Sequence, residues 1–185
     1  TAAGNNTIVG DSLQFNTFDP GNCTLVECPQ SGFSNTALGS SALFSNSSGY
    51  ANTAVGSGYS GAGLVAVDAR QYDDPPAPLF NNNSGHGNTA IGFAALFSNT
   101  TGNDNVAVGH KAGDMGDTLG YLSGITTGSN NIYLGANVRG SSYTESNAMY
   151  LGRQGTQTKT IIAGIRGITT GVNDAIPVMI DSNGQ

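Results

Sequence analysis

The chain has 185 residues; 28 are glycine, only 10% are charged and 37% are hydrophobic. So few charged residues exclude a fold of amphipathic helices, whereas abundant Asn, Ser, Thr and Gly are typical of short strands joined by turns. The hydrophobic content argues against simple disorder. A formal net charge of −6 without a Lys/Arg stripe argues against nucleic acid as a partner, and no apolar run approaches the roughly 20 residues that span a bilayer.

A five-residue pattern that ends in an aliphatic residue and Gly occurs seven times. Its copies are Asn6–Gly10, Asn35–Gly39, Asn52–Gly56, Asn88–Gly92, Asn105–Gly109, Asn131–Gly135 and Ala148–Gly152. The aliphatic residue and the residue two positions before it, mostly β-branched, share one face of an extended chain. Each copy is therefore a predicted strand. The Asn that opens six copies can bond its own backbone at a turn or form a ladder with the Asn of the next copy. The closing Gly fits a positive φ or a close approach between copies.

Three pairs of these glycines are 17 residues apart, which defines a coil of 17 residues, and the longer spacings place insertions at about 11–34, 57–87 and 110–130. Short strands at a fixed period predict a solenoid of parallel, stacked coils. Leu43/Phe44 and Leu96/Phe97 are expected to form a second inward-facing strand in their coils. Two strands enclose so little apolar volume that one aliphatic row should face water, which predicts oligomerisation.

The segments "NTALGSSALFSNSSGYANTAVG" (35–56) and "NTAIGFAALFSNTTGNDNVAVGHKAG" (88–113) resemble the head repeats of trimeric autotransporter adhesins. Similar blocks occur in phage tail fibres and other trimeric surface fibres. The resemblance implies an all-β, left-handed parallel β-roll with inserted loops over residues 1–157, assembled as a homotrimeric fibre. The repeat residues that would carry it are Asn35, Gly39, Asn52, Gly56, Asn88, Gly92, Asn105, Gly109, Gly135 and Gly152.

The C-terminal segment 158–185, "TKTIIAGIRGITTGVNDAIPVMIDSNGQ", shows a second resemblance. It is similar to the segment that precedes an endosialidase-type intramolecular chaperone in phage and bacterial fibres. The resemblance implies a trimerising β segment. The chaperone itself would be missing, either through autocleavage or because the sequence stops before it.

The insertions hold the candidate ligand-binding residues, because recognition usually lies in loops displayed on a rigid repeat. Aromatic, acidic and basic side chains close together can stack on a sugar ring and bind its hydroxyls. The alternative is a set of loops that only pack on a neighbouring chain. The candidates are Arg70, Tyr72, Asp73, Asp74, Phe80 and His86 from the second insertion and Tyr121 from the third.

No metal or cofactor is expected. Asp114 and Asp117 could contribute to a Ca²⁺ site, but such a site needs 6–8 oxygen ligands. Cys23 and Cys28, the only cysteines, are too few for zinc, which prefers about four ligands. We expect a local disulfide between them, which would imply an oxidising compartment, with two free buried thiols as the alternative.

The sequence does not predict an enzyme. Asp73 and Asp74 are adjacent, so in an extended chain they point to opposite sides and cannot flank one glycosidic bond. Neither histidine lies near a nucleophile-elbow motif. We expect an extracellular, trimeric adhesin or receptor-binding tip on a cell surface or virion, with a surface glycan or protein receptor as partner. A purely structural fibre shaft and a polysaccharide-degrading fibre enzyme are the alternatives.

Overall fold

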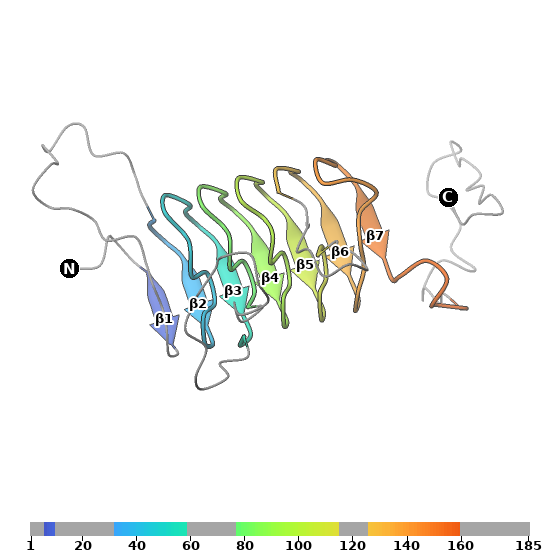
Figure 1. Ribbon diagram of the computed structural model, residues 1–185, viewed down its shortest axis with the longest axis horizontal. Coiled ribbons are helices and arrows are strands. Elements are labelled where there is room, and N and C mark those ends of the chain that lie inside the picture. The colour runs from blue at the N-terminus through green and yellow to red at the C-terminus, as the bar shows by residue number, and fades with distance from the viewer. Residues whose placement is uncertain (1–5, 10–31, 59–76, 115–125, 160–185) are drawn as a thin grey trace, which may run out of the picture.

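The computed structural model describes residues 6–9, 32–58, 77–114 and 126–159, and contains no helix within those ranges. Seven three-residue strands form one parallel sheet in which the strand order is the chain order (Figure 1). The strands are β1 (Thr7–Val9), β2 (Thr36–Leu38), β3 (Thr53–Val55), β4 (Thr89–Ile91), β5 (Val106–Val108), β6 (Ile132–Leu134) and β7 (Met149–Leu151). These are the seven strands predicted from the repeat, and the described part of the chain is all-β.

The register of the sheet is the same at every step. Thr36 pairs with Thr53 where the coil has 17 residues, and Thr53 pairs with Thr89 across the longer connection that follows. Val106 pairs with Ile132 in the same manner. The connections of extra length therefore leave the sheet without shifting its register.

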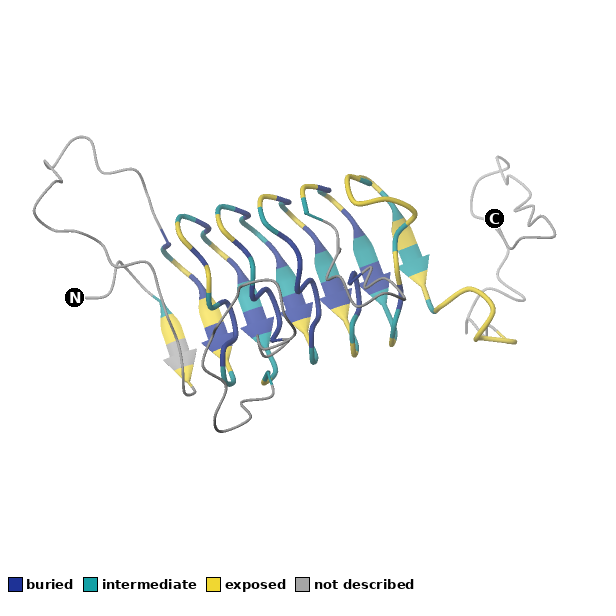
Figure 2. Cartoon of the chain, viewed as in Figure 1, coloured by how far each residue is buried: buried dark blue, intermediate teal, exposed yellow. Residues whose placement is uncertain are grey.

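The core lies behind the middle residue of each strand. Successive side chains of a strand point to opposite faces, and the middle residues of β2 to β6 are buried (Figure 2). They pack against residues from the opposite wall of the coils. The core cluster is Ala37, Ala42, Leu43, Ala54, Leu79, Ala90, Ala95, Leu96, Ala107, Ala112, Tyr133 and Val138.

The predicted second strand is wrong. Leu43, Leu79 and Leu96 occupy equivalent positions in that wall, and all three have positive φ, between 49° and 57°. A left-handed residue breaks the alternation of an extended strand, so the wall is built of turns. Its coils are still joined by backbone hydrogen bonds, such as Leu79 N–H to the Ala95 carbonyl at 3.0 Å. Each coil therefore has one strand.

Of the two roles predicted for the opening Asn, the ladder is confirmed. The Asn52 N–H donates to Asn35 Oδ1 at 2.9 Å, and Asn52 Nδ2 donates to the Gly85 carbonyl at 2.8 Å. The same arrangement recurs in neighbouring coils, so buried amides whose desolvation would be costly are hydrogen-bonded. The ladder comprises Asn6, Asn35, Asn52, Asn88, Asn105 and Asn131. A second ladder, unforeseen from the sequence, comprises Asn46, Asn82 and Asn99.

The prediction for the closing glycines is also confirmed. Gly39 has φ +124°, and a Cβ on it would lie 2.2 Å from the Gly56 carbonyl oxygen. Gly92 and Gly109 show the same combination of positive φ and backbone contact with the next coil. No side chain fits at these positions, because the backbones of successive coils meet there.

Candidate functional site

The outward-facing side of the sheet is apolar. The last residue of each strand points away from the core, and many of these aliphatic side chains are exposed, from 37% for Val108 to 62% for Leu151. We call the surface formed by the first and last residues of the seven strands the outer face. The exposed aliphatic row predicted from the narrow coil is therefore present in the single chain. Exposed apolar rows of this kind are typical of surfaces that associate with another molecule.

The outer face changes character along the sheet. Its other column is formed by the first residue of each strand, which is Thr in β1 to β4 and then Val106, Ile132 and Met149. Met149 is 65% exposed. The face is thus mixed at one end of the sheet and wholly apolar at the other.

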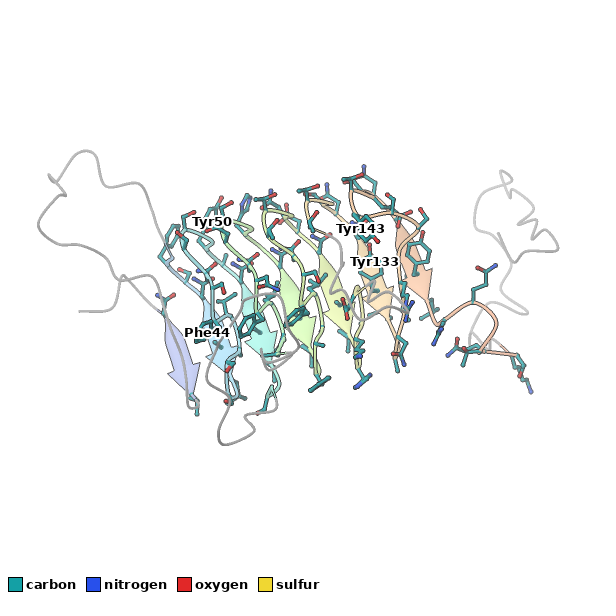
Figure 3. The ribbon with its side chains drawn as sticks, in the orientation of Figure 1. Phe44, Tyr50, Tyr133 and Tyr143 are labelled. Atoms are coloured by element: carbon teal, nitrogen blue, oxygen red, sulfur yellow. The ribbon has the colours of Figure 1, made fainter. Side chains whose placement is uncertain are left out.

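Three aromatic side chains stack from coil to coil at the turn before the strands. Phe33 and Tyr50 have ring centroids 5.0 Å apart and nearly parallel planes, and Tyr50 and His86 are 4.5 Å apart at 6°. All three are half-buried. We call them the ring column. Figure 3 shows Tyr50 along the upper edge of the coils, whereas Phe44 lies lower.

The same position in the following coils is polar and has a structural role. Asn103 Oδ1 accepts the His86 N–H at 2.9 Å, Ser129 Oγ accepts the Asn103 N–H at 3.0 Å, and Ser146 Oγ accepts the Ser129 N–H at 3.0 Å. The phenol ring of Tyr50 offers no acceptor nitrogen, and the His86 imidazole accepts no such bond within the described residues. Among the described residues, the N–H groups of Phe33 and Tyr50 find no acceptor. The ring column therefore replaces two hydrogen bonds that later coils make.

The ring column ends at His86, because the next residue in line is Asn103. Beside it, Asp104 is exposed, and a Cβ on Gly87 would lie 2.3 Å from Asp104 Oδ1. The carboxylate therefore lies close above Gly87. Thr101, two residues before Asn103, is also exposed. We call the group His86, Gly87, Thr101, Asn103 and Asp104 the ring step.

A separate polar cluster closes the last described coil. Glu145 accepts from Tyr150 Oη at 2.8 Å, from Ser141 Oγ at 2.6 Å and from the Ser141 N–H at 2.9 Å. Burial raises the pKa of Glu145, but the hydrogen bonds from Ser141 and Tyr150 outweigh burial and hold this pKa below its ordinary value. These contacts hold the turn in place, because Ser141 and Tyr150 both donate to the same carboxylate.

The structure places only two of the predicted ligand-binding residues. Phe80 is 4% exposed and stacks between Phe44 and Phe97, at centroid distances of 5.0 and 5.4 Å. It therefore lines the wall of a coil, which contradicts the expected role in a binding loop. His86 is half-buried in the ring column. Arg70, Tyr72, Asp73, Asp74 and Tyr121 lie outside the described residues, as do Cys23 and Cys28.

The repeat itself explains where Phe80 and His86 lie. The segment "PLFNNNSGHGNTAIG" (78–92) matches "ALFSNSSGYANTAVG" (42–56) position by position, which aligns Phe80 with Phe44 and His86 with Tyr50. Residues 77–87 thus follow the coil, although the spacing of the glycines placed them in an insertion. The ring column and Asp104 were missed, but the same alignment reads Phe, Tyr, His, Asn, Ser, Ser along this position.

Within the described ranges, no three His, Cys, Asp or Glu side chains come together in a way that could hold a metal ion. Nor do those ranges contain a helix long and apolar enough to cross a membrane. A comparison of the chain with models of known protein families, with curated protein sequences and with solved structures found no match.

Proposed function

We propose that the chain is the head of a homotrimeric extracellular fibre on a cell surface or virion. In this proposal it forms a left-handed β-roll solenoid and acts as an adhesin or receptor-binding tip that captures a cell-surface glycan. The observation that carries the proposal is the aliphatic row of the outer face, which runs across all seven strands and is largely exposed.

Three chains with their outer faces turned to a common axis would remove this surface from water. Burial of apolar area is the main driving force of such association. The gradient from Thr in β1 to β4 to aliphatic residues in β5 to β7 favours a parallel assembly, because equal heights then meet and the most apolar strands pack together. Oligomerisation also compensates for a core in which most strands contribute only Ala.

The unchanged register supports a display function. The pairing of β3 with β4 and of β5 with β6 matches that of the short coils despite the longer connections. A rigid rod that tolerates added segments can present binding loops without losing stability. Three identical weak sites on one rod would raise the apparent affinity for a repetitive surface.

The first test is a glycan array probed with the native protein and with a variant carrying Tyr72→Ala, Asp73→Ala and Asp74→Ala. Binding by the native protein alone would support a lectin-like adhesin and locate its site in the second insertion. A native trimer that binds neither glycans nor cells would overturn the adhesin proposal. It would favour the structural shaft, for which the continuous Asn ladder and the outer face would suffice.

A second test addresses the outer face. Val108→Asp places a charge on the outer face. The proposed trimer would bury this charge, so the substitution should dissociate the trimer. Asn83→Asp, on an exposed turn, adds the same charge elsewhere and should leave the trimer intact. Sedimentation velocity reads out both variants, and a Val108→Asp protein that sediments like the native one would exclude the outer face as the interface.

A further inference from the structure

We propose that the ring step binds one neutral sugar unit of a glycan chain, with the His86 ring as the stacking surface and Asp104 as the acceptor for sugar hydroxyls. This inference rests on the proposed glycan-binding function and assigns a site to it outside the insertions. It follows from the end of the ring column, the position of the carboxylate and the hydrogen bonds that the rings replace.

The end of the column leaves one ring face without a ring partner. Each face of Tyr50 meets another ring, Phe33 on one side and His86 on the other. His86 meets Tyr50 on one side only, because the next coil offers the smaller side chain of Asn103. A sugar can use such a face for the same apolar contact that stacked rings make.

Polar residues of the same and the following coil lie beside His86 in the ring step. Asp104 and Thr101 are exposed, and the Asp104 carboxylate lies above Gly87, where any larger residue would displace it. Carboxylates accept hydrogen bonds from hydroxyl groups strongly, because the acceptor is charged. Asn103 is fixed by its bond to the His86 N–H at 2.9 Å. One ring face, a carboxylate, an amide and a hydroxyl therefore belong to two adjacent coils.

The ring column is not required by the coil. Asn103, Ser129 and Ser146 show that a small polar residue serves this position better, since each accepts a backbone N–H from the preceding coil. Phe33, Tyr50 and His86 break this local rule without a compensating hydrogen bond. Positions where a sequence departs from its own structural pattern are often functional sites.

A second ring pair provides a contrast. Phe93 and His110 stack at 5.2 Å in the turn after the strands. The next residue in that line is Ala136, which offers no hydrogen-bonding side chain. The sugar site is therefore assigned to His86 and not to His110.

The test uses His86→Asn and Asp104→Asn. Asn at position 86 repeats the arrangement of Asn103 and offers the Tyr50 N–H an acceptor, so this variant should fold at least as well as the native protein while lacking the ring. Asp104→Asn keeps the shape and removes the charge. The probes are immobilised neutral oligosaccharides ending in galactose, glucose, mannose or N-acetylglucosamine, and the readouts are binding affinity, assembly mass and thermal unfolding.

We expect each variant to bind the preferred probe about tenfold more weakly per site, with the mass unchanged and no loss of thermal stability. His110→Asn is the matched control and should bind like the native protein. If the native protein binds and both ring-step variants bind equally well, the ring step is not the site, although the adhesin proposal stands. If the native protein binds cells but none of the probes, the sugar assignment fails while the adhesin role remains.

Discussion

The ring of Tyr133 occupies space in the core that a side chain at position 113 would need. A Cβ built on Gly113 would lie 3.1 Å from Tyr133 Cδ2 and 2.8 Å from Leu96 Cδ2. In the preceding coils the equivalent positions hold Leu43, Leu79 and Leu96. In the earlier coils the wall contributes Leu and the strand contributes Ala. Here the wall contributes Gly113 and the strand contributes Tyr133, so the large side chain comes from the other side of the core.

This exchange predicts strong coupling between the two positions. Gly113→Leu should overpack the core and cost about 1–3 kcal/mol, and Tyr133→Ala should leave a cavity and cost about 3–5 kcal/mol. The double variant restores the pairing of Leu and Ala found in earlier coils, where Leu adopts the same positive φ. Chemical denaturation should show it to be at least about 2 kcal/mol more stable than additivity predicts. Additivity within about 0.5 kcal/mol would mean that the two residues do not compete for space.

Tyr133→Phe should stabilise the protein. The Tyr133 hydroxyl is buried and has no hydrogen-bond partner among the described residues, so its removal should add about 1 kcal/mol to the free energy of unfolding at neutral pH. Burial, followed by the charge of Glu145, raises the pKa of Tyr133 above its ordinary value.

Because the pKa of Tyr133 is raised, the native protein and Tyr133→Phe should differ in how their stability depends on pH above neutrality. A group with a raised pKa contributes its stability below the unfolded pKa, about 10 for Tyr. Native stability should therefore fall as the pH rises above this value, and more steeply than that of Tyr133→Phe. Parallel pH profiles of thermal unfolding would show that the phenol is not shielded from water.

Asn88→Ala should destabilise the coils by about 3 kcal/mol. Asn88 Nδ2 donates to Asn52 Oδ1 at 3.1 Å and to the Gly102 carbonyl at 2.8 Å, and Asn88 Oδ1 accepts the Asn105 N–H at 3.1 Å. Removal of the amide leaves buried groups without partners. Asn83→Ala, on an exposed turn, should change stability by no more than about 0.5 kcal/mol. Equal effects in urea unfolding would contradict a structural role for the ladder.

Gly39→Ala should prevent stacking of the second and third coils. Its Cβ would lie 2.2 Å from the Gly56 carbonyl oxygen, so the backbones must separate. Gly155 is the matched control, because it also has positive φ but a Cβ on it would meet no atom within 4 Å. Gly155→Ala should cost only the strain of the left-handed conformation, about 1–2 kcal/mol. If circular dichroism shows both variants equally folded, close approach of the coils is not what selects Gly at position 39.

The strands were predictable because their signal is repeated. Asn35 and Gly39 recur with a fixed spacing, and the alternation between them places Ala37 and Leu38 on opposite faces. The structure shows that Ala37 is the inward residue and Leu38 the outward one. The Asn ladder follows from the same repeat, since identical residues at equal heights meet in a stacked fold.

The opposite wall and the ring step were less accessible. Consecutive apolar residues such as Leu43 and Phe44 suggest a strand, but positive φ at Leu43 is a tertiary compromise that residue type does not reveal. The spacing of the glycines assigns Phe80 to an insertion, whereas a match along the whole repeat aligns it with Phe44 in the wall of the coil. Asp104 belongs to no motif, and only the geometry places its carboxylate over Gly87.

The central claim is that three chains associate through the outer face, and the most direct measurement is the mass of the native protein by sedimentation equilibrium at micromolar concentration. The proposal predicts three times the 18.7 kDa of the single chain, about 56 kDa. A mass of 18.7 kDa would contradict it, because the aliphatic row from Val9 to Leu151 would then remain in water.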